Sequence, residues 1–184
     1  MRTILPEEKN PALREIARDI PVADIRGVAV KKLIADMKSL LAKEKYGVAL
    51  AASQLGVPLR LFIVSGRALA RGSRNAPDES SEASAKENSI PPAPDQVYIN
   101  PVILKMSRTK KDKHEGCLSV RGKWGIVPRA EKTMLSAYDE NGAKVTRGAS
   151  GFLAHVFQHE MDHLDGILYP DKAIALYDDK PEKK

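Results

Sequence analysis

Residues 159–163, with the sequence HEMDH, have the types and spacing of a metal-binding helix. Histidines four residues apart lie on one helical face with about 6 Å between their Cβ atoms, so His159 and His163 can reach one ion. Glu160 lies beside that face, where its carboxylate can contact a water without being a ligand. The spacing therefore predicts hydrolysis at a metal ion. The alternative is two solvated histidines, but apolar residues on both sides of the motif favour a buried helix.

A catalytic site of this kind needs a third protein ligand and leaves one position open for water. His155 extends the same helical face but would have to reach back across a whole turn, so we interpret it as a hydrogen-bonded helix residue. Asp165 and the acidic residues after it are further candidates, but Asp165 lies too close to His163 along the chain to reach the same ion easily. Cys117, the only cysteine, is the better candidate because a thiolate is a strong ligand for zinc or iron. Taken alone, a single cysteine is more often an inert core residue.

A third segment, residues 47–54, is rich in glycine and alanine and ends in Gln54. Small residues let another backbone approach closely, and the side-chain amide of Gln54 can donate to a developing oxyanion. The ordinary explanation for such small residues is a contact between packed helices.

Together, the three segments resemble the three motifs of the peptide deformylase family, in the family's order. Residues 47–54 match its glycine-rich motif, residues 115–119 match its cysteine motif EGCLS, and residues 159–163 match its HExxH motif. The resemblance runs from about Pro6 to about Pro170 and is interrupted near residues 66–96. Asn100-Pro101 and the segment 127–129 also look like family features.

The resemblance implies a role for each matched residue. Cys117, His159 and His163 would hold the metal, and Glu160 would take a proton from the attacking water and pass it to the leaving amine. The Gln54 amide would stabilise the oxyanion.

Further roles follow from the same resemblance. The backbone N–H of Leu118 would also stabilise the oxyanion, and Glu115, paired with Arg129, would hold the metal loop in place. The residues that would pair with the extended substrate backbone are Gly47, Val48, Ala49 and Leu50.

The resemblance implies a hydrolase of protein biosynthesis, acting in N-terminal processing. It would remove the formyl group from the N-terminal formyl-methionine of a newly made polypeptide and release formate. One divalent ion is implied, with Fe²⁺ as the ion in the cell. The site would bind Zn²⁺ more tightly than Fe²⁺, and Ni²⁺ or Co²⁺ would also fit. One alternative is a zincin-like endopeptidase, which would need a third ligand other than Cys117. The other is a catalytically silent family member that has become a binding protein.

Two departures from the family motifs affect the substrate site. Ala49 stands where the family has its second glycine, and we expect alanine to adopt the ordinary β conformation there. The stretch Arg121–Trp124 also differs from the family. Trp124, the only tryptophan, either shapes the pocket for the methionine side chain or has an ordinary packing role.

The elements around these motifs indicate an α+β fold. It is a single domain of residues 1–184, with antiparallel strands packed around a C-terminal metal-binding helix. Apolar residues at three- and four-residue steps predict a helix over 24–46, and a shorter helix over 11–18 would be capped by Asn10. Strands are predicted at 59–64, 98–104 and 133–138, with a hairpin turn at Asn141-Gly142 leading into 144–146. The metal-binding helix begins near Ser150.

Residues 66–96 interrupt this pattern. Their centre, residues 71–87, has almost no apolar side chains, and three prolines follow. Such a segment cannot bury enough surface to offset its chain entropy, so we expect a disordered insertion there.

Composition limits the cellular setting. The chain has 184 residues, with 42% hydrophobic and 29% charged side chains, which is typical of one globular domain. No run of eighteen apolar residues is present, so no membrane association is expected. The first residues lack a signal peptide, and Glu7 and Glu8 argue against a transit segment. One cysteine excludes an internal disulfide. We expect a cytoplasmic monomer.

The net charge of +6 raises the question of a nucleic-acid partner. Basic residues are scattered among acidic ones and aromatic residues are sparse, so we expect no DNA binding and interpret the charge as a solvated surface. A transient ribosome contact is the remaining alternative. Only fourteen residues follow Pro170, too few for the long basic helix by which some relatives touch the ribosome.

Overall fold

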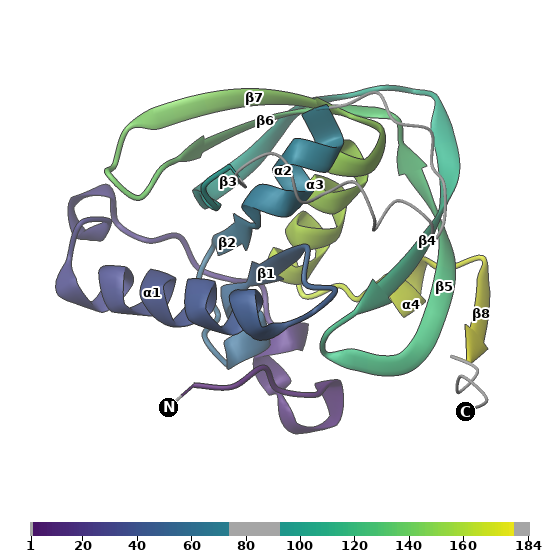
Figure 1. Ribbon diagram of the computed structural model, residues 1–184, viewed down its shortest axis with the longest axis horizontal. Helices are drawn as coiled ribbons and strands as arrows, with labels where there is room; N and C mark the ends of the chain where they lie inside the picture. The colour runs from purple at the N-terminus through teal and green to yellow at the C-terminus, as the bar shows by residue number, and fades with distance from the viewer. Residues whose placement is uncertain (1, 74–92, 179–184) are drawn as a thin grey trace.

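Two antiparallel sheets and one buried helix organise the chain (Figure 1). The computed structural model describes residues 2–73 and 93–178. In chain order the elements are α1 (Val28–Lys43), β1 (Ala49–Ala51), β2 (Leu61–Val64), α2 (Gly66–Ser73), β3 (Gln96–Met106), β4 (Lys110–Cys117), β5 (Val120–Ala130), β6 (Lys132–Tyr138), β7 (Lys144–Ser150), α3 (Gly151–Leu164), α4 (Tyr169–Lys172) and β8 (Ala175–Asp178). The predicted α+β fold, with antiparallel strands around a C-terminal helix, is confirmed.

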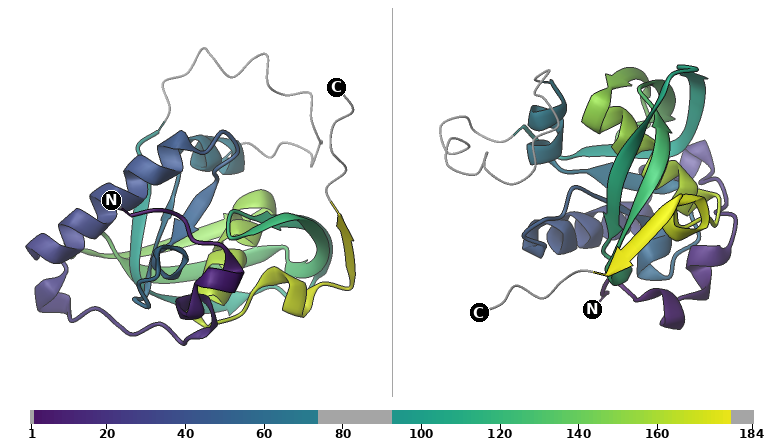
Figure 2. Two further views of the ribbon diagram at one scale, coloured as in Figure 1. Left: turned by 90° about the horizontal axis from the view of Figure 1, so that it is seen from below. Right: turned by 90° about the vertical axis from the view of Figure 1, so that its right-hand side faces the viewer.

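The larger sheet has the order β1-β2-β3-β6-β7, and the smaller one has the order β4-β5-β8. Each pair of neighbouring strands is antiparallel. In Figure 2, β4 and β5 form a twisted hairpin beside the larger sheet, with β8 along the outer edge of β5. The helix α3 contacts strands of both sheets, so it lies where the sheets meet.

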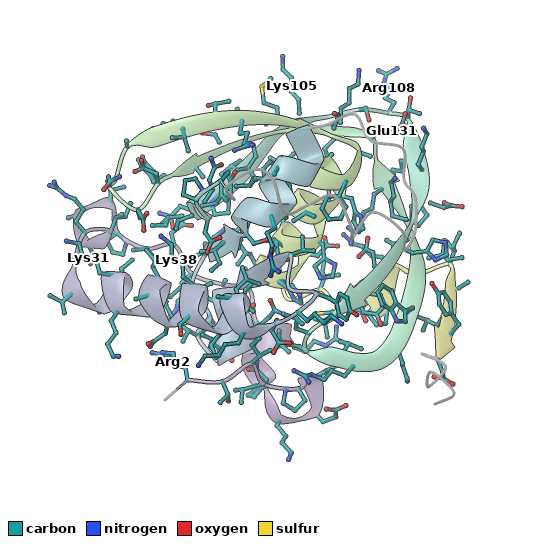
Figure 3. The ribbon with its side chains drawn as sticks, in the orientation of Figure 1. Arg2, Lys31, Lys38, Lys105, Arg108 and Glu131 are labelled. Atoms are coloured by element: carbon teal, nitrogen blue, oxygen red, sulfur yellow. The ribbon has the colours of Figure 1, made fainter. Side chains whose placement is uncertain are left out.

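Helices cover both faces of the larger sheet. On one face, α1 buries Leu33, Ile34 and Met37 against β2 and the first half of β3. The middle of α1 is tied to the β6–β7 turn, because Lys38 Nζ donates to Glu140 at 2.8 Å (Figure 3 labels Lys38).

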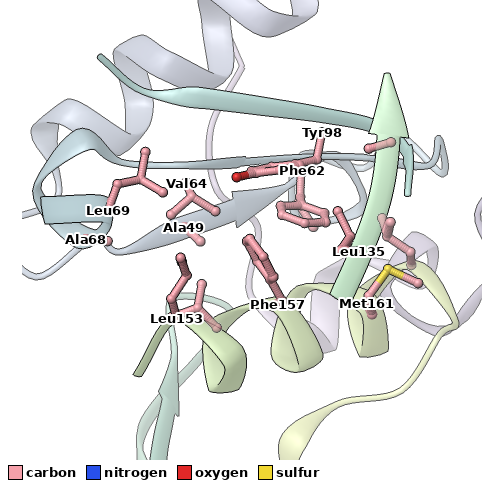
Figure 4. Close-up of a cluster of buried hydrophobic side chains, with 14 of the residues drawn as sticks. Ala49, Phe62, Val64, Ala68, Leu69, Tyr98, Leu135, Leu153, Phe157 and Met161 are labelled. Carbon is pink, nitrogen blue, oxygen red and sulfur yellow. The ribbon is translucent and has the colours of Figure 1, made fainter. Parts of the chain in front are cut away.

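The other face of the larger sheet packs on α3, as Figure 4 shows. Phe157 of α3 meets Phe62 and Tyr98 of the sheet, with ring centroids 6.1 and 5.2 Å away. This packing fixes the rotation of α3, and therefore the direction in which its histidines point.

Two predicted helices differ from the structure. Residues 11–18 do not form one helix: Pro11–Arg14 is a short 3-10 helix, and Arg18 pairs with Leu59 in an isolated bridge. The Asn10 side chain donates to the Ser53 carbonyl at 2.8 Å instead of capping a helix. The longer helix begins only at Val28, because Gly27 has an extended backbone.

Part of the predicted insertion is ordered structure. Gly66–Ser73 forms α2, and Ala68 and Leu69 are buried in the core beneath it. The rest of that prediction lies mostly in residues 74–92, outside the described residues. The strands predicted at 59–64, 98–104 and 133–138 are present as β2, β3 and β6, whereas β4, β5 and β8 were not predicted. Within the described part of the chain, no helix is long and apolar enough to span a membrane.

Candidate metal centre

Three side chains from two segments of the chain converge on one point. Cys117, His159 and His163 each offer a ligand atom, and these atoms all lie within 4.8 Å of one another. Both histidines come from consecutive turns of α3, with ring centroids 4.9 Å apart and nearly perpendicular planes. Cys117 ends β4, just after a register shift in the β4–β5 ladder. Its Sγ lies 3.3 Å from His163 Nε2.

The pKa shifts favour a Cys117 thiolate beside a protonated His159, and a bound metal would take the place of that proton. Burial raises the pKa of the Cys117 thiol, but the neighbouring His163 and His159 outweigh burial and hold that pKa well below its ordinary value. Burial lowers the pKa of His159, and here Cys117 and Glu115 outweigh it and raise the pKa well above the ordinary value. A thiolate beside two imidazoles is a donor set that zinc and ferrous iron accept. The three residues therefore fit a divalent metal.

Glu115 orients one of these ligands. Its Oε2 lies 2.8 Å from His159 Nδ1, which leaves Nε2 of that ring as the atom that could bind a metal. Its two oxygens also accept hydrogen bonds from Arg129 Nε and Nη2, at 2.6 and 2.9 Å. Arg129 Nη1 donates to Asp162 of α3 at 2.6 Å. The expected pairing of Glu115 with Arg129 is present, and it joins β4, β5 and α3.

The Glu115 carboxylate is charged in this setting. Burial raises the pKa of Glu115, but hydrogen bonds from Arg129, His155 and His159 together bring that pKa far below the ordinary value. His155 thus serves as a hydrogen-bonding residue, with its Nε2 at 3.1 Å from Glu115 Oε1. It is not among the converging ligand atoms, and neither is Asp165, which pairs with Arg60.

This buried ion pair gives a stability prediction. Arg129→Met should destabilise the metal-free protein by about 3–5 kcal/mol, because it leaves the Glu115 charge buried and without its main partner. Lys38→Met, which breaks the partly exposed pair with Glu140, is the control and should cost about 0–1 kcal/mol. Urea unfolding of both variants measures the difference. Equal losses would show that the Glu115–Arg129 pair adds nothing beyond a surface pair.

Gln54 points its amide at the metal centre. It lies in the 3-10 helix Ala52–Leu55 that directly follows β1. Its Oε1 accepts a hydrogen bond from the Ala51 backbone N–H at 2.9 Å. The amide nitrogen therefore faces Cys117 Sγ at 3.5 Å and Ser119 Oγ at 3.3 Å. Ser119 was not predicted as a site residue, although it is the last residue of the EGCLS motif.

Glu160 is a buried carboxyl with spare hydrogen-bonding capacity. Its Oε2 has no hydrogen-bond partner among the described residues. Burial raises the pKa of Glu160 to about 7; Cys117 and Glu115 add to this effect, and His163 and His159 oppose it. A carboxyl with such a pKa can both accept and release a proton near neutral pH.

The strand β1 lies at the edge of the larger sheet. The Val48 carbonyl accepts from the Ser65 N–H on the β2 side, so the N–H and C=O of the next residue, Ala49, point toward the opposite edge. No other described strand pairs there. The Ala49 side chain is buried in the cluster between the sheet and α3 (Figure 4).

Ala49 has the extended backbone expected of it. Among the described non-glycine residues, only Asn100 has a positive φ. Gly47 and Val48 precede the strand, and Leu50 points to the α1 side of the sheet.

Leu118 and Trp124 flank the cysteine. Leu118 follows Cys117 directly, in the turn between β4 and β5. Trp124 of β5 lies flat against Gly116, where a Cβ would be 3.1 Å from the indole ring. The indole therefore packs on the metal loop, and its part in a methionine pocket stays a prediction.

The chain is similar to proteins of known family over most of its length. Peptide deformylase 1 of Bordetella pertussis is 37% identical over 167 residues, covering 91% of this chain and 85% of that protein. Peptide deformylase 1A, chloroplastic/mitochondrial, of Arabidopsis thaliana is 36% identical over 165 residues. That match covers 90% of this chain but 59% of the plant protein. The crystal structure of peptide deformylase from Thermotoga maritima superposes with a TM-score of 0.74 and 26% identity, covering 95% of this chain and 99% of that one.

The α+β fold and the Cys-His-His site define a hydrolase of the metal-binding type. The chain belongs to the polypeptide deformylase family, because the model of that family matches residues 1–178. Deformylation of N-formyl-methionine is the function of the family.

Proposed function

We propose that this protein removes the N-formyl group from the formyl-methionine of newly made polypeptides and releases formate. The main support is the meeting of side chains from three segments at one point. The candidate ligand atoms of Cys117, His159 and His163 lie within 4.8 Å of one another, and the Gln54 amide reaches the same point from the 3-10 helix after β1. A zincin-like endopeptidase would need another third ligand, and a silent binding protein would not need Glu160 and Gln54 at the same point.

Cys117, His159 and His163 would hold the metal. Bound there, a divalent ion supplies Lewis acidity and lowers the pKa of a water. We propose Fe²⁺ as the ion in the cell, with Zn²⁺, Ni²⁺ or Co²⁺ able to replace it. A thiolate beside an open coordination site can be oxidised, so the iron form should lose activity in air faster than the nickel or cobalt forms. Equal lifetimes would count against iron.

Three groups of the chain would act on the reacting atoms. The Glu160 carboxylate would accept a proton from the water that attacks the formyl carbon, then deliver it to the amine that leaves. The Gln54 amide and the Leu118 backbone N–H would donate to the oxyanion that forms on the formyl oxygen. Because Ala51 fixes the Gln54 side chain, this donor is in place before the substrate arrives.

The edge of β1 would bind the substrate. An extended peptide can add as a further strand beside Ala49, using the backbone N–H and C=O that point away from β2. Gly47, Val48 and Leu50 would complete this contact. The formyl group would then lie beside Gln54, a few residues further along the chain.

We further propose a monomer that works in the cytoplasm on nascent formyl-methionyl chains, with a transient ribosome contact and no DNA or membrane partner. The Arabidopsis relative, by its name, is chloroplastic/mitochondrial. Family membership supports the nascent polypeptide as substrate.

The decisive experiment is a formate-release assay. Protein purified without air, with its metal content measured, should release formate from formyl-Met-Ala-Ser. It should not cleave the same peptide without the formyl group. Cleavage of unformylated peptides would point to an endopeptidase, and no reaction with either peptide would point to a binding protein.

Ala49 gives a second prediction. Ala49→Gly should change kcat/KM on formyl-Met-Ala-Ser by less than about tenfold, or about 1.4 kcal/mol. The reason is that Ala49 is extended and its methyl group lies in the core, away from the substrate edge. A gain of about a hundredfold would show that the methyl group misplaces the peptide, and that the natural substrate is different.

A further inference from the structure

Basic side chains gather on the turn between β3 and β4. Residues 105–113, which we call the basic hairpin, contain five basic residues and one acidic residue. The basic ones are Lys105, Arg108, Lys110, Lys111 and Lys113. Figure 3 shows Lys105 and Arg108 reaching outward at one end of the molecule, near Glu131. These nine residues therefore hold a net +4 of the overall +6, so the basic residues are more clustered than their mixture with acidic ones along the chain indicates.

Most of this charge is not neutralised by neighbours. Lys105, Arg108 and Lys110 are exposed and make no ion pair with any described residue. The same holds for Lys132, which starts the adjacent strand β6. Lys111 is paired with Glu131, at 2.6 Å.

The backbone that carries these charges is held in place. Ser107 N–H donates to the Lys132 carbonyl at 2.9 Å, and Glu131 N–H donates to the Thr109 carbonyl at 3.1 Å. The Lys132 N–H in turn donates to Ser107 Oγ at 3.1 Å. The turn is therefore anchored to the start of β6, and it presents the basic side chains from a fixed surface.

We propose that the basic hairpin docks on the phosphate backbone of ribosomal RNA. The inference rests on the proposed function, because a substrate that is a nascent polypeptide is presented at the ribosome. Phosphate contacts need positive charge and no base stacking, and the hairpin has five basic residues and no aromatic one. Docking raises the concentration of the enzyme near its substrate without changing the active site.

The position of the hairpin sets the length of nascent chain that can react. Strand β4 runs from Lys110 at the hairpin to Cys117 at the metal centre. Seven steps along a strand span about 23 Å. A nascent chain must therefore extend about seven residues beyond the docked RNA surface to reach the site. Shorter chains should gain nothing from docking.

The test compares two triple variants of equal charge. One is Lys105→Ala/Arg108→Ala/Lys110→Ala in the hairpin. The control is Lys9→Ala/Lys31→Ala/Lys43→Ala, whose residues are exposed and lie before β1; Lys31 is on α1, at the other end of the molecule in Figure 3. Affinity for bacterial ribosomes is measured between about 50 and 200 mM salt. The hairpin variant should bind at least about tenfold more weakly, and its salt slope should fall by about 2 to 3.

A separate assay keeps this inference apart from the proposed function. Formate release from free formyl-Met-Ala-Ser should be equal in the wild type and both variants. If the wild type releases no formate, the proposed function fails while ribosome affinity still decides the role of the hairpin. Unchanged ribosome affinity in the hairpin variant, or an equal loss in the control, would overturn the inference. So would wild-type protein that binds anionic lipid vesicles and not ribosomes.

Discussion

Glu160→Ala should keep its metal and lose turnover by about 100- to 10,000-fold, the usual contribution of a general acid–base group. Metal binding and proton transfer fall to different residues. Glu160 lies between the two histidines in sequence, yet its carboxylate is not among the converging ligand atoms. Removing it takes away the group that moves the proton and leaves Cys117, His159 and His163 in place.

Because Glu160 is buried, alanine also leaves a cavity. Glu160→Gln is the matched variant, since it keeps the volume of the side chain but cannot accept the proton. Both variants should contain wild-type amounts of metal and show the same loss of kcat. If either variant came out metal-free, or if the glutamine variant kept most of its activity, Glu160 would not be the base.

The site residues that lie on α3 could be predicted from the sequence. The spacing of His159 and His163 fixes their common face, and the apolar residues Phe157 and Met161 that bury α3 recur at a helical interval. The helical repeat alone therefore gives two of the three proposed ligands and the position of Glu160. Cys117 could be predicted because it is the only cysteine and stands in the EGCLS motif.

Features that depend on strand register could not be predicted. Glu115 meets Arg129 and His159 only because β4 pairs with β5 and both pack on α3. Strand β4 itself is almost entirely polar before Cys117, so it lacks the alternation of apolar residues that reveals a strand. For residues 11–18 the error was a predicted element that does not form. Their local signals favour one helix, but only Pro11–Arg14 forms a 3-10 turn. The Ala17 N–H donates to the Leu164 carbonyl and Arg18 pairs with Leu59, and these tertiary contacts hold the second half of the segment extended.

Cys117→Ala should lose most of the bound metal and all measurable deformylation. Loss of a residue that only orients a ligand typically lowers metal affinity by about 10- to 100-fold, so loss of a ligand should lower it by more than about 100-fold. Among the three proposed ligands, Cys117 is also the one that carries a negative charge, because its thiol has a pKa held well below the ordinary value. Metal affinity is measured with Zn²⁺ and Co²⁺, and the fold is checked by urea unfolding of the metal-free protein.

Cys117→Asp is the informative partner of the alanine variant. A carboxylate restores both the negative charge and a donor atom, although oxygen is a harder ligand than sulfur. We expect Cys117→Asp to recover part of the metal affinity. Ser119→Ala, two residues along the same turn, should keep full metal occupancy, because the Ser119 hydroxyl contacts Gln54 and is not among the proposed ligands. Full metal occupancy in Cys117→Ala would show that the thiolate is not a ligand. The site would then need a different third ligand, as an endopeptidase of the zincin type does. The position of Cys117 beside His159 and His163 would need another explanation.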